Sequence, residues 1–111
     1  MSFTVRYTDE AKADIFRNAH WWAKHHSLEQ ALRWESAVEN QISALQEMPE
    51  RHGVAPENDD FPYEIRQKVI GLGSRPRYRA VFAIKEQEVF ILAVRAGEEN
   101  RLAPDDVAFE S

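Results

Sequence analysis

The 111-residue chain contains no cysteine, and this absence excludes disulfide bonds and thiolate metal sites. It also lacks any apolar run near the roughly 20 residues that a membrane-spanning helix needs. The N-terminus, MSFTVRYTDE, has neither the basic nor the apolar region of a signal peptide. We therefore expect a cytoplasmic protein with no membrane association. Its length predicts one domain over residues 1–111, because domains usually run to roughly 100–200 residues.

Motifs of the common cofactor and metal sites are missing as well. His20, His25 and His26 fall in the segment HWWAKHH, but they lack the i, i+4 spacing of helical metal ligands. Gly71 and Gly73 stand in IGLGSRP, which is too short to cradle a phosphate and predicts a turn. There is no P-loop, dinucleotide motif or serine, histidine and acid arrangement. The sequence predicts no metal and no cofactor.

Charge is present but unevenly spread. The net charge is −5, yet residues 63–95 carry seven Lys/Arg against three Asp/Glu, a balance of +4. Residues 1–62 carry six against eleven, and residues 96–111 carry one against five. A basic segment inside an acidic chain indicates a binding face.

The first half of the chain predicts a strand followed by two helices. Apolar and polar residues alternate over 3–7, as in a strand. Thr8 fits the N-cap of a first helix that ends near His26. Ser27 opens the capping box SLEQ of a second helix, and Pro49 ends it. The two helices should pack as a hairpin, because almost no loop separates them. The apolar stripe of the second helix is Leu28, Ala31, Trp34, Val38, Ile42 and Leu45.

The second half predicts three strands after a loop of turn-forming residues at 50–62. The strands cover 63–69, 78–84 and 89–94, and the tight connection KEQE joins the last two. The last strand, VFILAV, is apolar on both faces, so we expect it at the centre of the sheet. The element order predicts an α+β fold: an N-terminal strand, a helical hairpin and a three-stranded antiparallel meander. The helices should cover one face of a mostly antiparallel sheet.

Under this arrangement the basic residues should share the sheet face that the helices leave uncovered. In RPRYRAVFAI (75–84), arginines alternate with apolar residues that should face the helices. A functional binding surface is one interpretation of this face, and a merely solvated sheet face is the other. The residues expected there are Arg6, Arg66, Lys68, Arg77, Arg79 and Arg95.

Three tryptophans lie on the predicted hairpin. The spacing places Trp22 and Trp34 in the core. Trp21 lies about 100° around the helix from Trp22, so it is expected at the surface, where it would indicate a protein contact.

The layout and several segments together resemble the RelE/ParE superfamily of bacterial type II toxin–antitoxin toxins. The ParE-like branch fits best, because its last strand commonly ends in a segment similar to VRAGEEN (94–100). The resemblance spans nearly the whole chain, although no single segment is a stringent motif. It rests on VRYTDEAKADI (5–15), the helical hairpin, YEIRQKVIG (63–71), YRAVFAI (78–84) and VFILAVRAGEEN (89–100).

The resemblance implies one of two activities. RelE-like members cut messenger RNA on the ribosome with clustered cations, whereas ParE-like members bind and poison DNA gyrase. For the nuclease, the residues that match or substitute are Arg66, Lys68, Arg79 and Arg95.

The nuclease set is incomplete in this chain. Glu64 stands at one basic position, and no tyrosine follows Tyr78. Glu98 and Glu99 occupy the segment where an arginine is expected, and acids there would repel RNA phosphates. We therefore favour a non-enzymatic toxin and expect no direct nucleic-acid binding.

The expected partner is a cognate antitoxin with an acidic and apolar tail, added as a strand or laid as a helix in a groove. The ParE-like resemblance implies DNA gyrase as a target, and the RelE-like alternative implies the ribosome. A homodimer and a toxin–antitoxin hetero-oligomer both stay open, as does a non-toxic interaction domain of the same fold. The residues expected to bind antitoxin or target are Arg66, Lys68, Arg77, Arg79 and Arg95.

Overall fold

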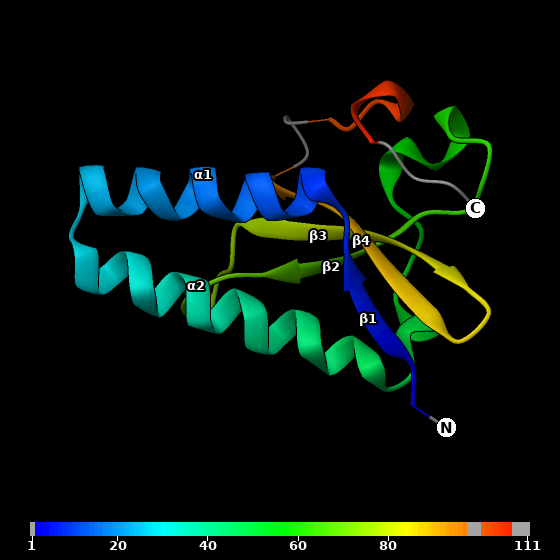
Figure 1. Cartoon of the computed structure of the whole chain (residues 1–111), viewed down its shortest axis with the longest axis horizontal. Coiled ribbons are helices and arrows are strands. Elements are labelled where there is room, and N and C mark those ends of the chain that lie inside the picture. The colour runs from blue at the N-terminus through cyan, green and yellow to red at the C-terminus, as the bar shows by residue number, and fades with distance from the viewer. Residues whose placement is uncertain (1, 98–100, 108–111) are drawn as a thin grey trace.

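A mixed four-stranded sheet with a helical hairpin on one face forms the centre of the computed structural model, which describes residues 2–97 and 101–107 (Figure 1). The strand order is β1-β4-β3-β2, with β1 parallel to β4 and the other neighbours antiparallel. The prediction of an α+β fold with a strand, a hairpin and a meander is confirmed. The elements are β1 (Thr4–Tyr7), α1 (Asp9–His25), α2 (Leu28–Ser43), β2 (Arg66–Ile70), β3 (Tyr78–Lys85) and β4 (Glu88–Ala96).

Both helices begin at the predicted caps. The Thr8 hydroxyl accepts a hydrogen bond from the Ala11 amide at 3.2 Å, and Ser27 accepts one from the Gln30 amide at 3.1 Å. The Thr8 hydroxyl also donates to the Ile91 carbonyl of β4, which fixes the start of α1 to the sheet. The predicted end of α2 at Pro49 is wrong. The regular helix ends at Ser43, because the chain tightens into a 3₁₀ turn at Ala44–Gln46.

The helix-facing side of the sheet holds the larger part of the core. Alternate residues of β1, including Val5 and Tyr7, pack there as predicted. Val89, Ile91 and Val94 of β4 join them, and β4 lies at the centre of the sheet. Leu28, which was expected in the stripe of α2, is instead exposed, because it occupies the first turn beyond the reach of the sheet.

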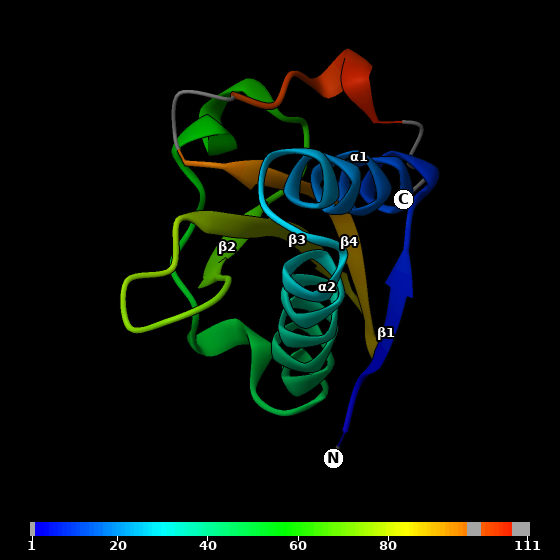
Figure 2. The same ribbon diagram turned by 90° about the vertical axis from the view of Figure 1, so that its left-hand side faces the viewer.

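The opposite face of the sheet is not open, which corrects the expectation of an uncovered basic surface. Residues 53–65 and 101–107 fold across it and enclose a second apolar cluster (Figure 1). Ile65 and Leu102 meet Val81 and Leu92 of the sheet there. The view along the helices shows α1 and α2 side by side against the sheet (Figure 2).

The three tryptophans are buried or exposed as their spacing predicts. Trp34 is fully buried, and Trp22 packs against the core while partly buried. Trp21 is 45% exposed, which is high for so large an apolar side chain. In the part of the chain that the structure describes, no helix is long and apolar enough to cross a membrane.

Candidate functional site

Arg79 on β3 lies inside the protein rather than on a binding face. Its side chain is 3% exposed and its guanidinium makes a bidentate ion pair with Glu57, which is 1% exposed. Arg79 Nε donates to the Gly97 carbonyl at 3.0 Å, and Glu57 also accepts from the Leu102 amide at 2.9 Å. Burial would raise the pKa of Glu57, but the hydrogen bonds from Arg79 and Leu102 outweigh it and lower the pKa. The ion pair thus joins β3 to both segments that cover the sheet.

Arg95, at the end of β4, is also engaged within the fold. Its guanidinium lies 2.7 Å from Glu10 and 3.2 Å from Asp14, both on α1. Asp14 is fully buried and accepts a further hydrogen bond from the Val94 amide at 3.0 Å. Burial and the neighbouring Asp14 raise the pKa of Glu10, although Arg95 opposes them. Arg95 therefore anchors the start of α1 to β4.

Arg66 lies on the helix side of β2, contrary to the expectation that placed it on the opposite face. The antiparallel register sets Arg66 beside Phe82, whose ring belongs to the helix-facing core. Arg66 Nη1 donates to the carbonyls of Glu50 and His52, and Nη2 lies 2.9 Å from the Glu64 carboxylate. The main contacts of Arg66 therefore hold the turn at Glu50 and His52 against β2.

Lys68 shares that side of β2 and contacts α2. Its Nζ donates to the Gln41 carbonyl at 2.6 Å. Burial and the positive Arg51 lower the pKa of Lys68. Burial lowers the pKa of His52 as well, with Lys68, Arg51 and Arg66 adding to the effect. The basic cluster therefore has four members whose positive charges repel one another: Arg51, His52, Arg66 and Lys68.

Arg77, a predicted binding residue, lines an open groove. The groove has a volume of about 510 Å³ and lies between the second half of α1 and the start of β3. The Trp22 indole donates to the Tyr78 hydroxyl at 3.1 Å across its floor. Within the described residues neither Arg77 nor the neighbouring Arg75 makes an ion pair. The lining includes Trp21, Trp22, Leu72, Arg75, Arg77 and Tyr78.

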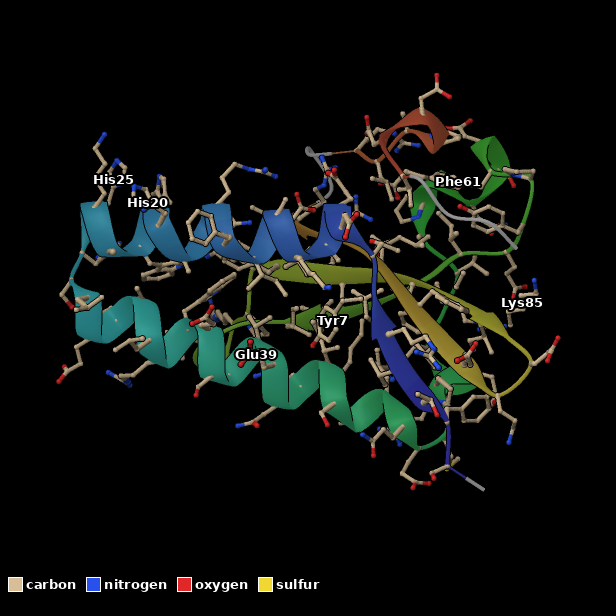
Figure 3. All side chains as sticks on the ribbon, in the orientation of Figure 1. Tyr7, His20, His25, Glu39, Phe61 and Lys85 are labelled. Atoms are coloured by element: carbon tan, nitrogen blue, oxygen red, sulfur yellow. The ribbon has the colours of Figure 1, made fainter. Side chains whose placement is uncertain are left out.

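Several other residues complete the comparison with the sequence. Arg6 pairs with Glu88 on the surface of β1 and β4. His20 and His25 project from the side of α1 away from the sheet (Figure 3). No cluster of potential metal ligands occurs among residues 2–97 and 101–107. Glu98, Glu99 and Asn100 lie outside the described residues.

Sequence reasoning missed the two buried acids, Glu57 and Asp14. Asp14 offers a weak signal, because it lies between Ala11 and Ile15 on the apolar stripe of α1. Glu57 offers none, since it stands in a loop of turn-forming residues. These two acids neutralise Arg79 and Arg95, which were both expected to face a partner.

This arrangement is a small α+β fold, in which a helical hairpin packs on one face of a mixed sheet. Residues 5–101 match the family model described as "ParE toxin of type II toxin-antitoxin system, parDE". The chain therefore belongs to the ParE toxin family.

A solved structure supports the fold, and a second one aligns more weakly. The structure titled "Chromosomal ParDE TA system from P. aeruginosa" aligns with a TM-score of 0.71 and 22% identity, over 87% of this chain and 98% of that one. A free E. coli RelE toxin with two arginines changed to alanine aligns with a TM-score of 0.49 and 17% identity, over 90% and 88% of the two chains. No curated protein matches the sequence.

Proposed function

We propose that this ParE-family toxin acts by binding DNA gyrase in the cytoplasm, and that a cognate ParD-type antitoxin neutralises it. The observation that carries the proposal is the internal use of the cations that RNA cleavage would need. Arg79 is buried against Glu57, and Arg95 is held by Glu10 and Asp14. A cation already paired with a carboxylate has little potential left to stabilise the developing charge on a scissile phosphate.

Antitoxin pairing rests on the family match and on the P. aeruginosa structure, whose title names a ParDE system. The assembly proposed here is a toxin–antitoxin hetero-oligomer in which the antitoxin covers an exposed surface of the toxin. Neither a membrane nor direct contact with nucleic acid is required.

One observation favours a second function, ribosome-dependent cleavage of messenger RNA. Burial lowers the pKa of His52 and of Lys68, and nearby cations of the basic cluster add to both effects. A cationic cluster with a titratable group of lowered pKa is a candidate for phosphate chemistry. However, Arg66 and Lys68 donate to backbone carbonyls, which favours a structural role for both.

Gyrase supercoiling tests the proposal. Purified toxin should inhibit ATP-dependent supercoiling of a relaxed plasmid by gyrase from the same organism, and added antitoxin should restore it. The control is a toxin carrying Trp34→Ala, which should inhibit less because it is destabilised by roughly 3–5 kcal/mol. Full supercoiling in a molar excess of folded toxin would remove gyrase as the target.

A further inference from the structure

We infer that the groove beside Trp21 binds a segment of the antitoxin in which a large apolar side chain stands between carboxylates. The inference rests on the proposed function, because it names where and how the proposed partner docks. Four observations support it: an apolar wall, two cations without ion pairs in the described structure, a preformed shape and a suitable size.

The wall of the groove is aromatic. Trp21, Trp22 and Tyr78 contribute three large rings from α1 and β3. The rings of His25 and His26 lie 4.6 Å from those of Trp21 and Trp22, respectively, and support them at the end of α1. Trp21 remains 45% exposed despite this packing. Exposed tryptophan in a concave site is the residue type that most often dominates a protein interface.

The rim of the groove is positive. Arg75 and Arg77 line it, and none of the described lining residues is acidic. The whole chain carries −5, so this rim departs from the prevailing sign. An approaching carboxylate would find guanidinium groups that no described residue already neutralises.

The shape of the groove is fixed before anything binds. Gln41 of α2 holds the connection between β2 and β3 through two bonds to Gly71: its Nε2 donates to the Gly71 carbonyl at 2.9 Å, and its Oε1 accepts from the Gly71 amide at 2.8 Å. Leu72 packs against the helix-facing core next to this anchor. A preformed site loses less conformational entropy on binding, which favours a short segment as ligand.

A peptide fits this site better than a nucleic-acid strand does. Nucleic acids are held mainly through their phosphates, which need a track of many cations, whereas two arginines line this groove. Most of its surface is apolar and aromatic, and its volume of about 510 Å³ lies in the range of roughly 300–1,000 Å³ for ligand pockets. One large apolar side chain with flanking carboxylates matches both the wall and the rim.

The experiment measures the dissociation constant of the antitoxin by titration calorimetry. Trp21→Ala should weaken binding by at least about 30-fold, as expected for a tryptophan at the centre of an interface. The double reversal Arg75→Glu/Arg77→Glu should weaken it by at least about 10-fold. The matched control, Arg33→Glu/Lys85→Glu, changes the net charge equally at exposed sites that do not line the groove and should cost about threefold or less. Unchanged thermal melts confirm that each variant is folded.

A second measurement uses a labelled 12-residue peptide with one tryptophan among aspartates and glutamates. Fluorescence anisotropy should show binding to the wild type that is lost in both groove variants. A peptide with serine for tryptophan, and one with lysines for the acids, should not bind. A labelled single-stranded oligonucleotide that bound the wild type and was released by the same variants would overturn the peptide assignment.

The outcomes separate the two proposals. If the antitoxin binds wild type and the groove variants equally, the groove inference is wrong while the proposed function stands. If the antitoxin does not bind the wild type at all, the proposed function fails and the inference fails with it.

Discussion

The Arg79–Glu57 pair shows how a single residue can carry a charge without presenting it to a partner. Both side chains are almost wholly excluded from water, and both make further hydrogen bonds to backbone groups. Burying two charges costs several kcal/mol per ion, and their attraction offsets this cost only when the remaining donors and acceptors are satisfied. The pair therefore specifies how residues 53–65 and 101–107 close over the sheet.

Replacing one member of this pair should destabilise the fold. Arg79→Ala should lower the free energy of unfolding by about 3–5 kcal/mol, because it leaves the Glu57 carboxylate buried without its cation. Urea unfolding provides the measurement. The double variant Arg79→Met/Glu57→Leu should recover most of the loss, since it removes both charges. A double variant no more stable than Arg79→Ala would contradict this account.

The same pair should make stability depend on pH. The pKa of Glu57 is lower in the folded state than its ordinary value. The unfolded chain therefore takes up the proton first as pH falls. The stabilisation from Glu57 is complete above the unfolded pKa of about 4.3 and declines as pH falls through the lower, folded pKa.

Wild type and Glu57→Gln should accordingly differ most near neutral pH, and the difference should shrink below about pH 4. Urea unfolding across pH 2–7 measures it. Glu10→Gln is a control that should show the opposite pH dependence. The pKa of Glu10 is raised in the folded state, so the stabilisation that Glu10 provides is lost as pH rises. A difference for Glu57→Gln that stayed constant across the range would exclude a lowered pKa for Glu57.

At the scale of elements, Trp34 is the largest of the buried side chains by which α2 packs on the sheet. Trp34 is fully buried in the helix-facing core, and its ring meets that of Tyr78 edge-on with centroids 5.0 Å apart. Its indole N–H has no hydrogen-bond partner among the described residues. The packing of the ring must therefore outweigh the cost of an unsatisfied donor.

Removing this ring should loosen α2. Trp34→Ala should destabilise the protein by roughly 3–5 kcal/mol, through lost burial and a residual cavity. Trp34→Phe should cost much less, because it keeps an aromatic ring and removes the unsatisfied N–H. Thermal unfolding followed by circular dichroism distinguishes them. Trp21→Ala, the same substitution at an exposed position, should change stability by less than about 1 kcal/mol; an equal loss at both positions would contradict the assigned facing.

Elements with local signals could be predicted from the sequence. Thr8 and Ser27 mark the helix starts, and the apolar run of β4 marks the central strand, because each signal depends on neighbours in the chain. The cover on the opposite face could not be predicted. Residues 53–62 and 101–107 have no periodicity, and the alternation that begins at Tyr63 predicts only a strand. Nothing local indicates that these segments meet over Val81 and Leu92.

The candidate site was harder to predict than the fold for a related reason. Period-two alternation correctly places Arg79 on the opposite face of the sheet from Ala80 and Phe82. It does not reveal which other segments cover each face. The apolar Val81 and Ala83, which pack with the second cluster on the Arg79 side, were the available signal. Unlike Arg79, Arg77 is exposed, because it lies just before β3 at the end of the sheet, where the groove begins.

At the scale of the whole molecule, the positive charge of residues 63–95 serves two purposes. Arg66, Lys68, Arg79 and Arg95 tie β2, β3 and β4 to other parts of the fold. The groove at the end of α1 keeps cations at its rim, next to an aromatic wall. This division favours binding of a partner over cleavage of RNA, because the cations that would act on a phosphate are the structural ones.

The last prediction follows from this division and concerns the toxin expressed without its antitoxin. Growth should slow, yet translated messenger RNA should stay intact. Loss of one group that stabilises a transition state commonly lowers a rate by about 100–1,000-fold, and here two of the expected cations are held by carboxylates. Primer extension on a reporter message in a translating extract measures cleavage.

Lys68→Ala is the informative variant, because Lys68 is the nuclease candidate with a lowered pKa and a partly exposed position. Arg79→Ala would be a poor control, since it should destabilise the fold by about 3–5 kcal/mol. Codon-phased cuts by the wild type that disappeared in a folded Lys68→Ala variant would establish the nuclease and overturn the binding proposal. We expect the message to stay intact with the wild type and with Lys68→Ala, and we expect the wild type to inhibit gyrase supercoiling.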